Sequence, residues 1–164
     1  MLKCFVDVII GNISLDTKLF HDIPHLTGYS PVSTIPLPCT QTNLKPDICI
    51  YDENNKKILI MELTIPFEFG IEKAHKYKVD KYSSLITDIR SNGYEVEFLA
   101  IEVGSRGFIS SDNNQRLKQM LGYLHERNTR PHEFRDRLSK MALVSSFAIY
   151  CAKDEPTWQE CRNL

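Results

Sequence analysis

Two acidic residues, Asp47 and Glu62, have positions that suit metal chemistry. They flank the polar run 52–57, whose centre at Asn54 and Asn55 tolerates positive φ and predicts a β-hairpin turn. A hairpin centred there places Asp47 opposite Glu62. Two carboxylates side by side among apolar residues are unfavourable unless a cation lies between them. Mg²⁺ or Mn²⁺ fits, because both prefer oxygen ligands and Mg²⁺ typically uses one or two carboxylates.

A purely structural interpretation of the two acids stays open. If the hairpin register shifts by one residue, Glu62 points to solvent, and a nearby lysine would also pair with it in an ordinary way. The surroundings of Glu62 argue for a special role, since the run 58–65 is largely apolar and an unpaired buried carboxylate is costly. From these residues alone, the two interpretations carry equal weight.

Lys78 is the candidate for a positive charge near the two acids. It lies four residues before Tyr82, on the apolar stripe of the helix expected over 72–90. That helix directly follows the strand that carries Glu62, so its inner face can cover the carboxylates. Lys81 flanks the same stripe. The alternative for Lys78 is a packed stem with the ammonium group in water.

Several elements must position these side chains. In chain order we expect a strand at 5–10, helical turns within 16–22, a proline-rich extended loop at 24–46, hairpin strands at 47–51 and 58–65, a helix at 72–90, a strand at 94–103, and helices at 112–127 and 131–152. This order predicts an α/β fold with a mixed sheet flanked by helices.

Composition bounds the class of protein. The chain has 164 residues, the size of a single domain, with 20 basic and 21 acidic side chains and a formal net charge of −1. Nucleic acid is therefore not bound by bulk charge, and any phosphate binding must be local. Five cysteines without a CxxC pair argue against a disulfide framework and favour an intracellular compartment. No apolar run approaches the ~18–20 residues that span a bilayer, so we expect no membrane partner.

The acidic segments resemble a known nuclease signature. Lys45-Pro46-Asp47, the hairpin and Met61-Glu62-Leu63-Thr64 are similar to the PD-(D/E)xK motif of restriction-endonuclease-like nucleases. The segments 62–68, 74–82 and 102–108 resemble more closely the endonuclease-like domains of some eukaryotic retroelement polyproteins. The resemblance covers residues 45–125 and implies a restriction-endonuclease-like core within the domain 1–164. It also implies hydrolysis of DNA, or of RNA, with Mg²⁺ or Mn²⁺.

The resemblance assigns roles to single residues. Asp47 and Glu62 would bind the metal, while the motif lysine falls here on Thr64. Some members carry that lysine on the neighbouring helix, where Lys78, with Lys81 second, would orient or deprotonate the attacking water. Lys45, Lys81 and Arg106 would contact the nucleic acid. An upstream acid is also common in the family, and Asp16 and Asp22 are the residues available for it.

Other residues near these motifs have weaker or divided interpretations. Glu68 follows Pro66, so it either caps the following helix or lies at the rim of the site. Arg106, among glycines at a strand end, either holds a phosphate or braces its loop. A zinc site at His21 and His25 is not expected, because Pro24 breaks any helix that would align them. His75 is expected to be exposed.

Three functions are consistent with these features. The leading hypothesis is a metal-dependent endodeoxyribonuclease of a mobile genetic element, located in the nucleus or cytoplasm. The second is a catalytically inert nuclease-fold module that binds nucleic acid or a protein, which the replacement of the motif lysine by Thr64 favours. The third is an assembly domain of a larger polyprotein that self-associates, for example as a homodimer, which the near-neutral charge fits.

Overall fold

The computed structural model describes residues 2–10, 17–21, 35–36, 38–124 and 130–153. Its elements are α1 (Leu2–Ile10), β1 (Thr17–His21), β2 (Ile48–Asp52), β3 (Lys57–Thr64), the 3₁₀ turn η1 (Glu68–Gly70), α2 (Ile71–Ser91), β4 (Glu95–Glu102), α3 (Ser111–Tyr123) and α4 (Pro131–Ala152). Within these ranges the strands form one four-stranded sheet in the order β1-β2-β3-β4. The expected α/β class with a mixed, helix-flanked sheet is confirmed.

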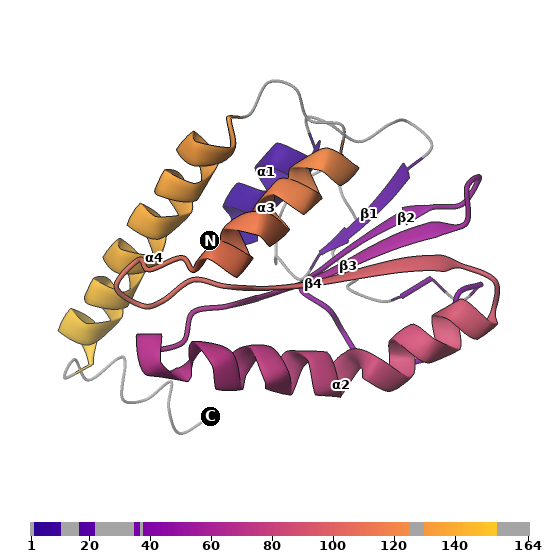
Figure 1. Ribbon diagram of the computed structural model, residues 1–164, viewed down its shortest axis with the longest axis horizontal. Helices are drawn as coiled ribbons and strands as arrows, with labels where there is room; N and C mark the ends of the chain where they lie inside the picture. Colours follow the sequence, from indigo (N-terminus) through magenta and orange to yellow (C-terminus); the bar gives the residue numbers. More distant parts are fainter. Residues whose placement is uncertain (1, 11–16, 22–34, 37, 125–129, 154–164) are drawn as a thin grey trace.

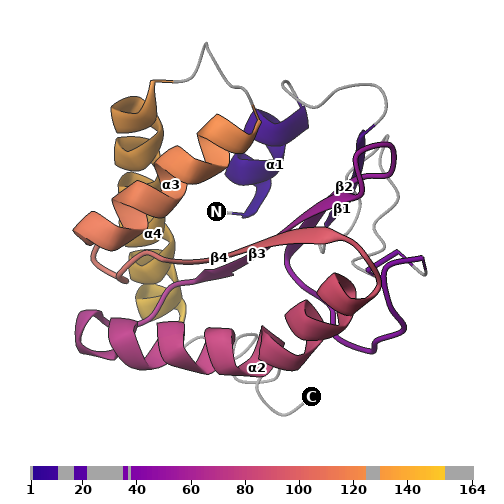
Figure 2. The same cartoon turned by 45° about the vertical axis from the view of Figure 1, so that its right-hand side comes forward.

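Helices cover both faces of the sheet. In Figure 1, α2 runs along one face while α1, α3 and α4 lie over the other, and the turned view in Figure 2 shows the same separation. Strand alternation divides the hairpin side chains between the two cores. Those facing α2 include Cys49, Tyr51, Ile58 and Ile60, and those facing the other three helices include Ile48, Ile50, Leu59 and Met61.

The hairpin has the predicted register. β2 and β3 are antiparallel, with Ile48 opposite Met61 and Asp52 opposite Lys57. Continued by one residue, this pairing sets Asp47 opposite Glu62. The side chain of Asp52 accepts hydrogen bonds from the backbone N–H and the side-chain amide of Asn55, which closes the turn. The turn therefore fixes the register that brings the two acids together.

The crossover from β3 through α2 to β4 makes the sheet mixed. β3 and β4 are parallel, with Glu62 beside Ala100 and Thr64 beside Glu102. Since residues paired in this way point to the same face, Glu62, Thr64 and Glu102 all face α2. They lie at the carboxyl ends of the two parallel strands, where ligand sites of open α/β sheets usually occur.

Two expectations for the first 22 residues are wrong. Residues 5–10, expected to form a strand, belong to α1, and the helical turns expected within 16–22 are replaced by β1. In α1 the exposed Lys3 and Asp7 are four residues apart on one helix face, and the apolar residues fill the core on the other side. Burial of an amphipathic face thus overrides the strand propensity of the β-branched residues.

The proline-rich region is only partly described. Residues 35–36 and 38–47 contain no helix or strand, as expected for an extended loop. The remainder of the expected loop, with His25, lies outside the described residues, as do Asp16 and Asp22. The helices expected at 72–90, 112–127 and 131–152 correspond to α2, α3 and α4.

Candidate active site

Glu62 is a buried carboxylate that receives donors from three directions. Its side chain is 2% exposed. Oε1 accepts a hydrogen bond from the Tyr82 hydroxyl at 2.5 Å and one from the backbone N–H of Asp47 at 3.3 Å. Oε2 forms an ion pair with Nζ of Lys78. These contacts stabilise a charge that would otherwise be strongly unfavourable inside the protein.

Asp47 lies next to Glu62 and is tied to the same strand. Its Oδ2 accepts the backbone N–H of Leu63 at 2.7 Å, while its own N–H donates to Glu62. Asp47 and Glu62 thus cross-link the entry to β2 with the end of β3. The juxtaposition of the two acids and the inward direction of Lys78 agree with the sequence prediction.

Tyr82 anchors this arrangement from α2. Its ring is fully buried and stacks on Phe98 with centroids 5.3 Å apart. Burial, and then the hydrogen bond to Glu62, raise the pKa of Tyr82, so the hydroxyl keeps its proton and remains a donor. Sequence reasoning used Tyr82 only as part of the apolar stripe and missed its polar role. The four-residue spacing from Lys78 was the available signal.

Two of the three expected nucleic-acid contacts, Lys45 and Lys81, contact Tyr82. Lys45 is exposed, and its carbonyl lies 3.3 Å from the Tyr82 hydroxyl. Lys81 is also exposed, with Nζ 4.8 Å from the centre of the Tyr82 ring. Thr64 is partly buried two residues beyond Glu62. Both lysines are therefore exposed residues that contact Tyr82, the hydrogen-bond donor to Glu62.

Arg106 and Glu68 bind each other. Glu68 accepts hydrogen bonds from the Arg106 backbone N–H at 2.8 Å and from its Nε at 3.0 Å. Partial desolvation raises the pKa of Glu68, but these bonds hold it below its usual value. The expected helix cap is wrong, because the N-cap residue of α2 is Gly70 and no side chain caps it. Arg106 braces its loop, which was one of its two interpretations.

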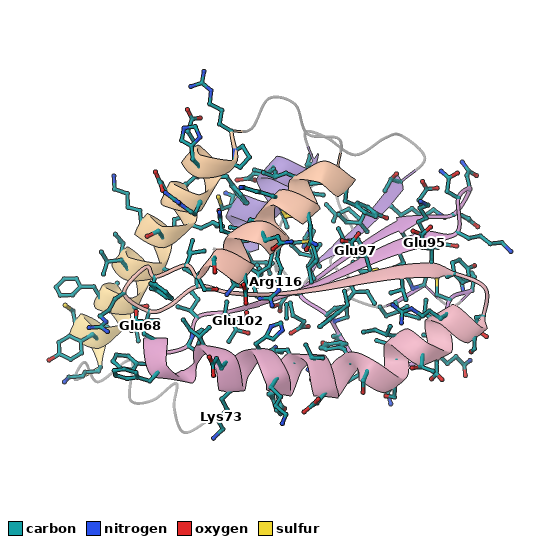
Figure 3. All side chains as sticks on the ribbon, viewed as in Figure 1. Glu68, Lys73, Glu95, Glu97, Glu102 and Arg116 are labelled. Carbon is teal, nitrogen blue, oxygen red and sulfur yellow. The ribbon has the colours of Figure 1, made fainter. Side chains whose placement is uncertain are left out.

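A second polar group, the Glu102 cluster, consists of Glu102, His75, Asn113 and Arg116. The Glu102 side chain is 1% exposed, with Oε1 3.1 Å from Nδ1 of His75 and Oε2 3.5 Å from Nη1 of Arg116. Asn113 Oδ1 accepts from the Glu102 backbone N–H and from Arg116. Figure 3 shows Arg116 of α3 beside Glu102 at the end of β4. His75, expected to be exposed, is instead partly buried in this cluster.

The acid pair offers oxygen ligands of the kind that a divalent cation prefers. Among the described residues there is no group of three or more His, Cys, Asp or Glu side chains that would hold a metal. Asp47 and Glu62 supply two carboxylates, a set that fits Mg²⁺ because this ion keeps several waters. Binding would require Glu62 to exchange its Lys78 contact for the cation.

Comparison with known proteins gives no relative. No family model, curated protein or solved structure matches the chain. Across the described ranges, none of the helices combines the length and apolar character needed to cross a membrane. What the site does must therefore be inferred from its own side chains.

Proposed function

We propose that this protein is a metal-dependent endonuclease with a restriction-endonuclease-like core, acting on the DNA of a mobile element in the nucleus or cytoplasm. The main support is the placement of Asp47 and Glu62 side by side at the end of β3, with Lys78 directed at them from α2. Phosphodiester hydrolysis needs such a combination, because charge must be balanced on both the attacking water and the phosphate oxygens.

Each residue has a defined task in this proposal. Asp47 and Glu62 would hold Mg²⁺ or Mn²⁺, which when bound neutralises phosphate charge and lowers the pKa of a coordinated water. Lys78 would orient the attacking water or stabilise charge on the phosphate oxygens. Thr64 carries no charge, so the role of the family's motif lysine falls to Lys78. Lys45 and Lys81 contact the nucleic-acid backbone.

The test is cleavage of DNA by Glu62→Gln, which keeps the size of the side chain but removes its charge. We expect metal-dependent cleavage to fall by roughly 10²-fold or more. Glu72→Gln, an exposed position on the first turn of α2, is the matched control and should retain full activity. Full cleavage by Glu62→Gln would overturn the assignment.

Calorimetric titration with Mn²⁺ separates the enzyme from the inert nuclease-fold module. If the protein is the enzyme, the wild type should release or absorb heat on binding Mn²⁺, and Glu62→Gln should lose this signal. No heat in the wild type, together with intact DNA binding, would favour the inert module.

A second candidate function, self-assembly, is favoured by α4. Its buried residues, Phe134, Leu138 and Ala142, lie in the first twelve positions of the helix. From Met141 to Ala152 the helix has no charged residue. The α4 patch consists of large apolar side chains that are each at least 48% exposed, namely Leu143, Val144, Phe147, Ile149 and Tyr150. Exposed apolar patches of this kind mark interaction sites.

The partner we propose for the α4 patch is a second copy of the chain. An uncharged surface offers nothing to a charged partner, whereas two-fold symmetry makes the same apolar surface complementary to itself. Aromatic side chains such as Phe147 and Tyr150 bury about 150–250 Å² each when fully covered, so the α4 patch would supply the apolar centre of an interface whose standard size is about 800 Å² per partner.

A further inference from the structure

The hydrogen bonds of the Glu102 cluster define the tautomer of His75. Arginine only donates hydrogen bonds, so Nε2 of His75, 3.2 Å from Nη2 of Arg116, must accept one. Nδ1 then carries the ring proton and donates it to Oε1 of Glu102 at 3.1 Å. A carboxylate that holds Nδ1–H fixes the tautomer and the ring orientation. It leaves Nε2 as the atom that can exchange a proton with a reactant.

His75 lies in line with the proposed active site. His75 and Lys78 are three residues apart on α2, a spacing that places Cβ atoms roughly 5–6 Å apart on one helix face. Their acidic partners, Glu102 and Glu62, face α2 from neighbouring parallel strands, and Thr64 is the strand partner of Glu102. The two ion-paired groups therefore form one row at the carboxyl ends of β3 and β4.

Access to this row differs between the members of the cluster. The side chains of His75 and Arg116 are 31% and 23% exposed, while Glu102 is 1% exposed. A solute can therefore reach the imidazole and the guanidinium, but not the carboxylate behind them.

The ion pair of Arg116 with Glu102 is incomplete. The 3.5 Å contact is too long for a good hydrogen bond, and Oε2 of Glu102 has no hydrogen-bond partner in the described part of the chain. A phosphate offers the guanidinium better acceptors than this contact. Turning of Arg116 towards a phosphate would uncover Nε2 of His75.

We propose that His75 is the general acid of the phosphodiester hydrolysis, with Glu102 as its positioning residue and Arg116 as a phosphate ligand. This role rests on the proposed nuclease function. When Arg116 turns to the phosphate, Nε2 takes up a proton from solvent, and Glu102 compensates the charge of the imidazolium.

The step balances without a further reactant. The water oxygen forms a bond to phosphorus, its proton passes to bulk water, and the bond from phosphorus to the leaving oxygen breaks. The electron pair stays on the leaving oxygen, which takes the proton from Nε2. Entering and leaving oxygens lie on opposite sides of phosphorus, which suits a row with Lys78 at one position and His75 one turn away.

A sulfur atom in the leaving position tests this role, because a thiolate departs without being protonated. The full-length protein is first incubated with a DNA oligonucleotide and Mn²⁺, and the position at which it cuts the DNA is mapped. The same oligonucleotide is then made with a bridging sulfur as the leaving atom. We expect His75→Ala to cleave the all-oxygen DNA roughly 10²–10⁴-fold more slowly than the wild type. On the sulfur substrate it should approach the wild-type rate.

Two further variants make the result specific. His75→Gln can still donate a hydrogen bond to Glu102 but cannot act as an acid, so it should show the same pattern with the fold preserved. His132→Ala, at an exposed position of α4, should cleave both substrates at the wild-type rate.

The outcomes separate the two proposals. Equal losses on the oxygen and sulfur substrates, or undiminished cleavage of the oxygen substrate by both His75 variants, would overturn the general acid and leave the nuclease intact. A folded wild type that cleaves neither substrate would overturn the nuclease function and the general acid with it.

Discussion

Glu62 is the residue on which the candidate site depends. Tyr82 and Lys78 reach it from α2, and the Asp47 backbone reaches it from the entry to β2. A buried ion pair of this kind is rarely the most stable choice, because apolar residues of similar volume often hold a protein together equally well. The proposed function gives this pair a role, since phosphodiester hydrolysis uses a carboxylate for the metal and a positive charge for the phosphate oxygens.

Lys78→Met should leave Glu62 buried without its cation. We expect the free energy of unfolding to fall by about 2–3 kcal/mol. This is less than the ~3–5 kcal/mol lost when one partner of a fully buried ion pair is removed, because Lys78 is 20% exposed. The double variant Lys78→Met/Glu62→Gln should recover most of the loss. Urea denaturation measures both values.

Lys73→Met is the matched control for this experiment. Lys73 points away from the sheet on the exposed side of α2, as Figure 3 shows, so its loss should change stability by no more than about 0.5 kcal/mol. Equal effects of the two lysine variants would show that the ammonium group of Lys78 does not stabilise Glu62.

The two polar groups differ in how far the sequence predicts them. Asp47, Glu62 and Lys78 depend on a hairpin register and a helical period, and both are local properties of the chain. The contact of Glu102 with His75 depends on the parallel register of β3 and β4. Arg116 joins them only because α3 packs near the end of β4. Such long-range placement has no local signature, which is why His75 was expected at the surface.

Among the elements, those from 47 to 103 were predictable because strand alternation, the Asn54-Asn55 turn and the helical stripe agree with one another. α2 ends at Asn92 and Gly93, and Gly93 has a φ of 82°, which glycine adopts readily. α1 and β1 could not be predicted from local sequence. The run in α1 is apolar at almost every position, so only packing against the sheet selects the helix, and β1 becomes a strand by pairing with β2.

The loop between β4 and α3 is held against α4 by Gly107. Its φ is 85°, and a Cβ atom there would lie 2.7 Å from the backbone oxygen of Ser139. Ser139 Oγ also donates to the Gly107 carbonyl at 2.6 Å. Gly107→Ala should therefore reduce the free energy of unfolding by about 1–3 kcal/mol in thermal denaturation.

Gly122→Ala provides the comparison within α3. A Cβ atom there meets nothing within 4 Å, and alanine has a higher helix propensity than glycine. The free energy of unfolding of this variant should therefore rise by roughly 0.5–1 kcal/mol. If Gly107→Ala were as stable as Gly122→Ala, the backbone of Gly107 would not lie in close contact with Ser139 of α4.

At the scale of the whole molecule, the two faces of the sheet are covered by different kinds of side chain. The face under α2 carries the ionisable groups of the candidate site, and the opposite face carries the larger apolar core under α1, α3 and α4. On this second side, the last half of α4 also exposes apolar side chains to solvent, which form the α4 patch.

Phe147→Glu tests assembly through the α4 patch. Phe147 is 65% exposed, and a charge at the centre of an apolar interface should weaken dimerisation roughly tenfold or more, that is by about 1.4 kcal/mol or more. Sedimentation of the full chain over a range of concentrations measures the effect. Arg135→Glu, exposed on the first half of α4, should sediment like the wild type. A wild type that stays monomeric at every concentration would exclude this interface.

The position of β4 in the sheet also bears on how the protein behaves at high concentration. β4 is an outer strand, and no strand pairs with its far side within the described residues. Unpaired backbone groups along such an edge invite strand addition between copies and hence aggregation. Glu97 and Glu95, which is ion-paired with Lys57 of β3, are both labelled on β4 in Figure 3 and place charged side chains on this outer strand. The strand that contributes Glu102 to the site thus carries its own protection against precipitation.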